Sequence, residues 1–239
     1  MKIAGRITAE ALMVAKEIIR PGISTKEIDT KIHRYILKCG AEPSFLGYGG
    51  FKGSACISIN EQVIHGIPSE TVILKDGDIV KVDVGARYRG YNGDSARTFP
   101  VGKVSDEALR LISVTEKSFY EAMKFAKAGC HLHDISAAIE DYVVAHGYSC
   151  VRDLVGHGIG KELHEDPQVP NFHQRRRGMK LVPGMTLAIE PMVNIGRPEV
   201  CWLDDDWTVV TEDETLSAHY ENTVLITEGE PELLSIRKK

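Results

Sequence analysis

The sequence contains four acidic residues and one histidine at positions where they could bind divalent metal ions. Segments predicted to be strands carry Asp83, Asp94, Glu190 and Glu221, and His157 stands between two glycines. Four carboxylates in one cleft repel one another strongly unless cations neutralise them. An imidazole beside them shifts the preference from calcium or magnesium toward manganese, iron, cobalt or zinc. Carboxylates that bridge predict two metal ions about 3.5–4 Å apart, an arrangement that generates hydroxide and binds a substrate oxygen.

A repeat with an offset of 107 residues places two of these acids on equivalent strands. The aligned pairs are Gly22 with Gly129, Ile28 with Ile135, Tyr35 with Tyr142, Gly40 with Gly147, Leu74 with Leu181, Gly77 with Gly184 and Asp83 with Glu190. Each half would then present a carboxylate to a shared central cleft. The alternative is that both halves are generic helix-then-strand units with solvent-facing acids, which does not account for an offset that is constant through so many landmarks.

Apolar spacing and turn residues predict the elements that position these acids. Helices are expected over residues 3–19, from Ser24 or Thr25 to about residue 40, near 105–127 and near 133–146. Strands are expected over residues 79–84 and near 185–193 and 217–226. A further strand, which returns after residues 79–84, is expected to carry Asp94. This order predicts an α/β fold of the α+β type, a mixed sheet with helices on one face.

Composition narrows the class of protein. With 239 residues, of which 43% are hydrophobic, the chain can bury a large core, and we expect one domain, residues 1–239, made of halves near 1–105 and 106–239. A net charge of −5 gives no reason to expect DNA binding. No signal peptide and no membrane span is recognisable. Five scattered cysteines form neither zinc motifs nor a disulfide framework, which predicts a reducing compartment.

Several short blocks, in order along nearly the whole chain, resemble the type I methionine aminopeptidases of the M24 metallopeptidase family. They are residues 56–60, 65–68, 82–85, 93–94, 97–99, 156–160, 164–165, 183–185, 189–191 and 221–223. The resemblance implies the pita-bread fold, in which two pseudo-symmetric halves form a curved, mostly antiparallel sheet with outer helices. It also implies metal-dependent removal of the N-terminal methionine from chains with a small second residue.

The resemblance further implies roles for the metal-binding candidates. Asp83 and Asp94 would bind one divalent ion, and His157 and Glu190 the other. Asp94 and Glu221 would bridge the two ions, whose identity (Co, Mn, Fe, Zn or Ni) the sequence leaves open. Metal-bound hydroxide would attack the scissile carbonyl, while Glu190 accepts the water proton and passes it to the leaving nitrogen.

Substrate contacts are implied in the same way. His65 would hydrogen-bond near the leaving nitrogen, and His164 would stabilise the developing oxyanion. The methionine side chain would enter an apolar pocket formed by Tyr48, Phe51, Cys56, Leu163 and Trp207, with Phe45 adjacent. Leu163 and Phe51 differ from the larger aromatic residue and the tyrosine often found there, which leaves the shape of the pocket open.

Two weaker expectations concern a third ion and the other histidines. Asn60 and Ser217 match positions that hold a structural monovalent cation in relatives. His131 and His133 are interpreted as surface and capping residues because the repeat aligns them with a helix start. His219, like the remaining histidines, has no supporting constellation in the sequence.

The resemblance also sets expectations for context. We expect no N-terminal extension, and the 25 residues between His164 and Glu190 leave no room for the helical insert of type II enzymes. Expected partners are nascent polypeptide N-termini and, transiently, the ribosome, but neither DNA nor a membrane. We expect a cytoplasmic monomer.

Three other functions match parts of the pattern. Prolidases and aminopeptidase P share the metal-binding set, but they usually carry a large N-terminal domain, and the block at residues 56–68 favours methionine removal. An inactive pita-bread protein that binds a partner such as ribosomal RNA would be expected to have lost ligands. A dinuclear phosphoesterase would need more histidine ligands and basic residues within the motifs.

Overall fold

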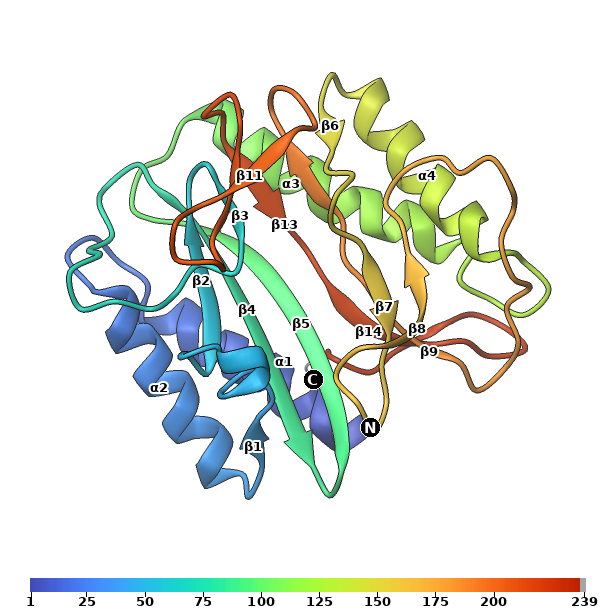
Figure 1. Cartoon of the computed structure of the whole chain (residues 1–239), viewed down its shortest axis with the longest axis horizontal. Helices are drawn as coiled ribbons and strands as arrows, with labels where there is room; N and C mark the ends of the chain where they lie inside the picture. The colour runs from blue at the N-terminus through green and yellow to red at the C-terminus, as the bar shows by residue number, and fades with distance from the viewer. Residues whose placement is uncertain (237–239) are drawn as a thin grey trace.

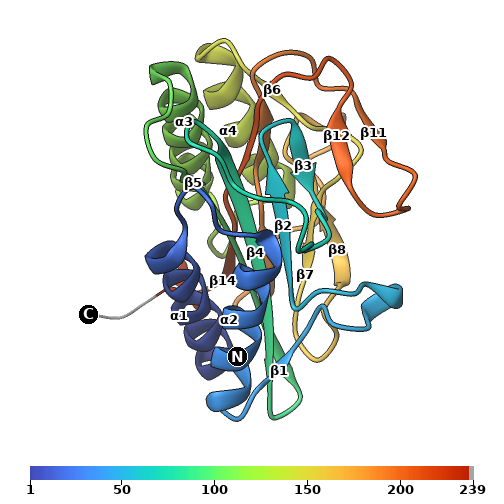
Figure 2. The same cartoon turned by 90° about the vertical axis from the view of Figure 1, so that its left-hand side faces the viewer.

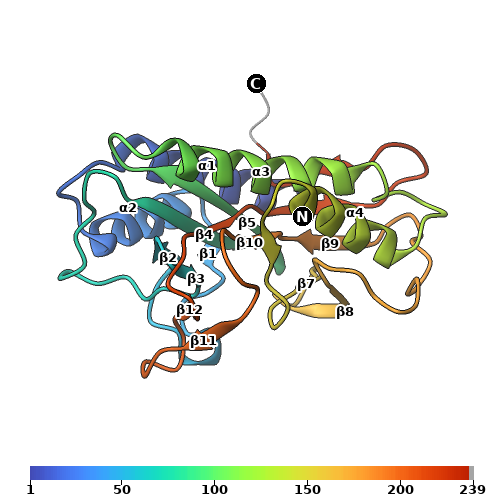
Figure 3. The same ribbon diagram turned by 90° about the horizontal axis from the view of Figure 1, so that it is seen from above.

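The computed structural model describes residues 1–236, and its four α-helices all lie on one side of the strands (Figures 1 and 3). The helices are α1 (Lys2–Ile18), α2 (Thr25–Lys38), α3 (Asp106–Met123) and α4 (Leu132–Ala145), with one 3-10 turn, η1 (Tyr48–Gly50). They confirm the four predicted helices, although α3 ends four residues earlier than expected. None of the helices in the described part of the chain is long and apolar enough to cross a bilayer.

The strands are short, apart from one long hairpin, and all their pairings are antiparallel. They are β1 (Glu42–Pro43), β2 (Ala55–Ile59), β3 (Gln62–Ile64), β4 (Ile79–Tyr88), β5 (Tyr91–Pro100), β6 (Ser149–Cys150), β7 (Gly156–Gly158), β8 (Glu165–Val169), β9 (Thr186–Ile189), β10 (Met192–Asn194), β11 (Val200–Trp202), β12 (Val209–Thr211), β13 (Ser217–His219), β14 (Asn222–Leu225) and β15 (Glu232–Leu233).

Each half of the chain contributes one larger sheet. In the first half, β1, β4 and β2 are neighbours in that order and β5 pairs with β4, whereas the second half has the order β15-β14-β9-β7-β8. Two smaller sheets, β13-β10-β6 and β11-β12-β3, complete the set. Seen from the side, α1 lies against β4 and β5 and α2 against β1 and β2, while β8, β11 and β12 lie on the opposite side (Figure 2).

The internal repeat is confirmed in three dimensions. Helix α4 begins and ends 107 residues after α2. The isolated bridges between Ser24 and Ile73 and between His131 and Lys180 show the same offset. Gly22 and Gly129 adopt φ angles of 87° and 91°, a left-handed conformation that glycine takes without strain. The two halves therefore share a backbone plan as well as a sequence pattern.

Each helix of the repeat begins at an equivalent capping residue. Ser24 Oγ accepts a hydrogen bond from the Glu27 backbone N–H at 3.1 Å, which satisfies a donor at the start of α2. At the start of α4 the backbone N–H of His131 donates to Asp134 Oδ2 at 2.8 Å. His133 contacts the carbonyl of Arg176. His131 therefore occupies the N-cap position of α4, as the repeat predicted, and its backbone N–H makes the hydrogen bond to Asp134.

Strand β4 separates an apolar face from a polar one. Val80, Val82 and Val84 are fully buried against α1 and α2, and each such side chain contributes about 1.5–3 kcal/mol when removed from water. Lys81 and Asp83 point to the other face, as side chains alternate along a strand. The burial of Lys81, which is 1% exposed, was not foreseen.

The second predicted hairpin differs from expectation because both of its strands are interrupted at the acids. The segment predicted near 185–193 divides into β9 and β10 at Glu190, and the one near 217–226 divides into β13 and β14 at Glu221. Pro191 has no backbone N–H and therefore cannot continue the ladder. The backbone N–H of Glu221 instead donates to Ala96 O in β5 at 2.9 Å. The interruption at Glu221 therefore joins the second hairpin to the first half.

Candidate metal centre and substrate pocket

One cavity of about 160 Å³ brings together the residues that the sequence predicted for metal and substrate binding. Its lining contains the predicted metal ligands and substrate histidines Asp83, Asp94, His157, Glu190, Glu221, His65 and His164. It also contains the predicted apolar pocket residues Tyr48, Phe51, Cys56, Leu163 and Trp207, together with Phe45 and Ile64. Ile64 escaped the sequence analysis, although its position beside His65 was a signal that could have found it.

The metal-binding candidates approach one another closely. Ligand atoms of Asp94, His157 and Glu221 all lie within 4.8 Å of one another. His157 Nε2 lies 3.6 Å from Glu190 Oε1. One oxygen each of Asp83, Asp94 and Glu221 is buried without a hydrogen-bond partner among the described residues. Buried polar atoms normally have partners, so these oxygens fit divalent cations of the kind that bind carboxylate and imidazole together.

Hydrogen bonds between the two halves hold two of these acids in place. The backbone N–H of Asp94 donates to Thr223 Oγ1 at 2.9 Å, and this hydroxyl donates to the Asp94 carbonyl, also at 2.9 Å. The guanidinium of Arg97 donates to the Glu221 carbonyl, which Ser95 Oγ also reaches at 2.7 Å. Asp94 and Glu221 therefore have fixed backbones, so only their side chains remain free to adapt.

Burial makes the negative charge of the cleft carboxylates unfavourable unless a cation is nearby. It raises the pKa of Asp94 to about 7, and it raises those of Asp83, Glu190 and Glu221 well above the ordinary carboxyl value. The charge of Asp94 is the next cause for each of these three carboxyls. Burial lowers the pKa of His157 to about 4, which keeps its imidazole neutral and able to ligate. Divalent cations would favour the ionised carboxylates.

The glycines beside His157 serve the packing of the backbone. A Cβ on Gly156 would lie 2.4 Å from Ala188 O in β9, and one on Gly158 would lie 2.2 Å from Asp166 O in β8. Since such distances are far below van der Waals contact, the neighbouring strands enclose His157 only because both flanking residues are glycine.

Two histidines border the entrance to the apolar pocket. His164 Nδ1 lies 2.7 Å from the Tyr48 hydroxyl, and its ring centre is 4.2 Å from that of His157. The His65 ring lies edge-on to Trp207, with 6.1 Å between centres. Burial, followed by the nearby His164, lowers the pKa of His65 to about 4. Burial also lowers the pKa of His164. A neutral imidazole keeps one N–H donor for substrate.

His65 is held in an unusual backbone conformation. Its φ angle is 60°, a left-handed value that is uncommon for residues other than glycine and that often occurs at functional sites. The next residue, Gly66, lies so close to β2 that a Cβ would be 2.3 Å from Ile57 O. The packing of Gly66 thus fixes the turn that aims His65 into the cavity.

Known proteins resemble this chain over nearly its whole length. Residues 1–228 match the sequence model of Metallopeptidase family M24. The chain belongs to this family. It is 52% identical over 236 residues to the methionine aminopeptidase of Clostridium acetobutylicum, a match that covers 99% of this chain and 94% of that protein.

Solved structures of known proteins are also similar to this chain. The crystal structure of methionine aminopeptidase from Thermotoga maritima is similar with a TM-score of 0.97 and 44% identity, covering 99% of this chain and 95% of that one. The prolidase from Pyrococcus furiosus is similar with a TM-score of 0.79 and 25% identity, covering 100% of this chain and 63% of that one. These likenesses confirm the predicted pita-bread fold.

The predicted monovalent cation site does not fit the residues present. Asn60 and Ser217 are adjacent, since the Ser217 backbone N–H donates to Asn60 O at 3.1 Å. The same oxygen accepts a hydrogen bond from Lys81 Nζ at 2.6 Å. Burial lowers the pKa of Lys81 to about 7, an effect that the charges of Glu61 and Asp78 oppose. The Asn60 carbonyl therefore already accepts two hydrogen bonds from groups of the chain, and we assign no monovalent ion to it.

His219 was dismissed in the sequence analysis, yet it lies beside the cleft. Its side chain is 1% exposed, and its Nε2 lies 3.6 Å from Glu190 Oε2. No local motif around residue 219 signals this position, because Glu190 is brought to it only by the pairing of β10 with β13.

Proposed function

We infer that this chain is a metal-dependent aminopeptidase that removes the N-terminal methionine from peptides and nascent proteins with a small second residue. The observation that carries the proposal is one cleft in which unpartnered buried carboxylate oxygens adjoin an apolar pocket. Membership of the M24 family and the methionine aminopeptidases among its relatives support the same reaction.

We propose that five side chains hold two divalent metal ions. Asp83 and Asp94 would hold one ion, His157 and Glu190 the other, and Asp94 and Glu221 would bridge them. Cobalt, manganese, iron, zinc and nickel all suit this donor set. When bound, such ions lower the pKa of water and polarise the substrate carbonyl.

The protein groups would complete the reaction around that centre. Glu190 would accept the proton of the attacking water and deliver it to the leaving nitrogen. The neutral imidazole of His164, oriented by the Tyr48 hydroxyl, would donate an N–H to the developing oxyanion. His65 would hydrogen-bond near the leaving nitrogen of the scissile peptide.

The apolar residues of the cavity would set the preference for methionine. Phe51 and Trp207 meet edge-on with 5.0 Å between ring centres and form one wall. Cys56 and Leu163 belong to the same apolar cluster. The apolar side chains that line the cavity suit an unbranched apolar side chain such as that of methionine.

The wider context remains part of this proposal. We propose that residues 1–239 form a single catalytic domain that acts as a monomer in the cytoplasm, on nascent N-termini and with transient ribosome contact. The family membership supports this setting, because nascent chains carry the methionine that such enzymes remove.

Peptide choice tests the proposal directly. The metal-stripped protein is incubated with Met-Ala-Ser and Ala-Pro-Ala, with and without added Mn²⁺ or Co²⁺, and products are measured by mass spectrometry. Release of methionine only with metal, with Ala-Pro-Ala intact, is the expected result. Cleavage before proline would instead assign the chain to the prolidase and aminopeptidase P branch, and turnover of neither peptide would reject the proposed activity.

A further inference from the structure

His219 occupies a rigid position behind the catalytic cleft. Its backbone N–H donates to Thr98 Oγ1 at 2.9 Å, and that hydroxyl donates to the His219 carbonyl at 2.9 Å. It also pairs with Met192 across the ladder of β13 and β10. The strand backbone is thus tied on both sides, and the imidazole has a fixed starting point.

The imidazole itself has no hydrogen-bond partner among the described residues, although it is fully buried. Burying an unpaired polar group costs about 1–3 kcal/mol, so an apolar side chain would fill this space at less cost. Glu190 Oε2 lies 3.6 Å from the imidazole Nε2. A shift of a few tenths of an ångström would make this a hydrogen bond.

Burial is the main cause that lowers the pKa of the His219 ring, to about 3, and the nearby His65, Lys81 and Arg97 act in the same direction. A neutral imidazole has one N–H and one acceptor nitrogen. Because Nε2 faces the Glu190 carboxylate, the tautomer that carries its proton on Nε2 is favoured.

Glu190 therefore lies between two imidazoles. His157 Nε2 approaches its Oε1 at 3.6 Å from the cleft side, and His219 Nε2 approaches its Oε2 at the same distance. An N–H donated to Oε2 would hold the carboxylate in one orientation. Oε1 would then stay directed to the cleft, where a ligand and proton acceptor is needed.

We propose that His219 is a positioning residue that donates its Nε2–H to Glu190 Oε2 and thereby orients this carboxylate for metal binding and proton transfer. The inference rests on the proposed function of Glu190. Hydrogen bonds to metal ligands of this kind typically change metal affinity or activity by about 10–100-fold.

Three variants test the proposal. His219→Leu removes the donor, His219→Gln keeps one N–H donor, and His33→Leu is a control at a half-buried histidine that bonds Ser54 outside the cavity lining. Mn²⁺ affinity of the metal-free proteins is measured by calorimetry, and kcat and KM are measured with Met-Ala-Ser. We expect His219→Leu to lose about 10–100-fold in Mn²⁺ affinity and in kcat with little change in KM. His219→Gln should recover most of this loss, and His33→Leu should match the wild type.

A structural role would give a different pattern. Equal losses in His219→Leu and His219→Gln, or unchanged Mn²⁺ affinity in His219→Leu, would overturn the proposal. The calorimetric arm remains informative even if the wild type does not cleave Met-Ala-Ser, so failure of the proposed activity is recognised separately.

A measurement on the wild type tests the proposal even if the variants do not fold. Long-range ¹H–¹⁵N NMR of the ring distinguishes the two neutral tautomers of His219. A proton on Nε2 is expected, and a proton on Nδ1 would leave Glu190 without the donor and reject the proposal.

Discussion

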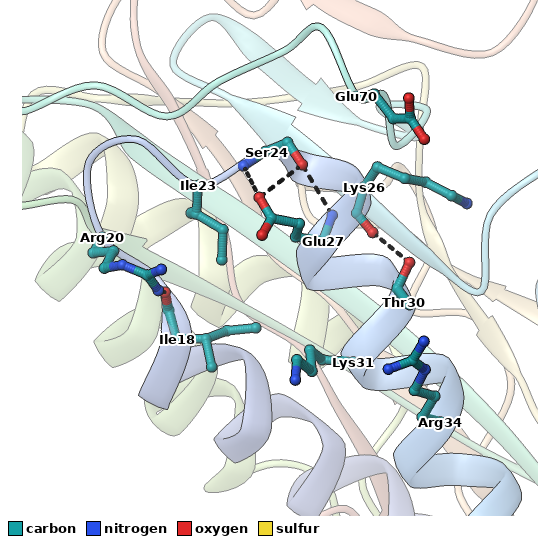
Figure 4. Close-up of a pocket in the computed structure, with 10 residues that line it drawn as sticks. All are labelled: Ile18, Arg20, Ile23, Ser24, Lys26, Glu27, Thr30, Lys31, Arg34 and Glu70. Carbon is teal, nitrogen blue, oxygen red and sulfur yellow. Dashed lines mark hydrogen bonds between the residues drawn. The ribbon is translucent and has the colours of Figure 1, made fainter.

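The cleft that we propose as the active site and a groove on the outer helices both contain charged side chains, but these side chains are in opposite electrostatic environments. The outer groove lies between the end of α1 and the start of α2 (Figure 4). It is lined by Ile18, Arg20, Ile23, Ser24, Lys26, Glu27, Thr30, Lys31, Arg34 and Glu70. At about 720 Å³ it is far more spacious than the cleft, at about 160 Å³.

Local partners satisfy several charges of the outer groove. Glu27 accepts from the Ser24 backbone N–H at 3.1 Å, and this hydrogen bond is the main cause that lowers its pKa. Lys26 pairs with Asp29 at 2.7 Å, and Arg20 donates to the Ile18 carbonyl at 3.1 Å. In the cleft, burial raises the pKa of each carboxyl instead, and several oxygens have no described partner. The cleft is therefore distinguished by buried carboxylates without partners, and not by its volume or its number of charges.

The largest expected effect comes from removing a charge that the cleft needs. Asp94→Asn should lower kcat/KM for Met-Ala-Ser by about three orders of magnitude, because bound metal contributes several kcal/mol to such a transition state. Its metal content, measured by mass spectrometry, should fall in parallel. Asp141→Asn is the matched control, since Asp141 is exposed and pairs with His173. Full activity in the Asp94 variant would rule out a metal-binding role for this residue.

A buried and an exposed lysine extend the comparison to cations. Lys81→Met leaves the Asn60 carbonyl with one partner fewer and should destabilise the protein by about 1–3 kcal/mol in urea unfolding. Lys31→Met, in the outer groove, should change stability by less than about 0.5 kcal/mol. The wild type should unfold at the same urea concentration in sodium, potassium or choline chloride. A specific gain in sodium or potassium would instead reveal an alkali cation site beside Lys81.

The cleft carboxyls should make the metal-free protein less stable as the pH rises. Unfolded carboxyls ionise near pH 4, whereas burial raises the pKa of Asp94 to about 7 and raises those of Asp83, Glu190 and Glu221 well above the ordinary carboxyl value. From about pH 6.5 to 8 the folded chain thus holds protons that the unfolded chain has released. Stability should fall by on the order of 1 kcal/mol per pH unit for each such group.

Two features check this dependence on pH. Lys81 opposes it by one proton at most, because burial lowers its pKa to about 7. The buried histidines His65, His157, His164 and His219 oppose it near pH 6.5, because burial lowers their pKa values below that of an unfolded imidazole. Urea unfolding with chelator at pH 6.5 and 8 gives the slope, and saturating Mn²⁺ should abolish or reverse it because metal binding requires ionised ligands. A stability that rises with pH in the metal-free protein would contradict the raised carboxyl pKa values.

The smallest effect is expected in the outer groove. Arg34 is exposed at its edge and forms no ion pair with another residue of the described part of the chain, so Arg34→Ala should change neither kcat/KM nor stability by more than about 0.5 kcal/mol. Peptide assays and urea unfolding measure both quantities. A loss of tenfold or more in kcat/KM would mean that the groove acts on the reaction, and the contrast with the cleft would no longer hold.

Much of the site was predictable because its signals are local. The repeat aligned Asp83 with Glu190, and the structure shows the same offset in the limits of α2 and α4. The strand interruption at Glu190 could have been anticipated from Pro191. Cys56 and Trp207, which are distant in sequence, were placed together only through the resemblance to a family, and the structure brings both to the same cavity.

The sequence by itself determined which residue types are available and where strands and helices occur, because hydrophobic periodicity, caps and turns act between near neighbours. Only the tertiary structure decided which side chains share a buried space. His219 faces Glu190, and Lys81 faces Asn60, because strands from different parts of the chain pack together and exclude water. In that environment a polar or charged group without a hydrogen-bond partner is unfavourable. The local sequence does not indicate which residue will be the partner.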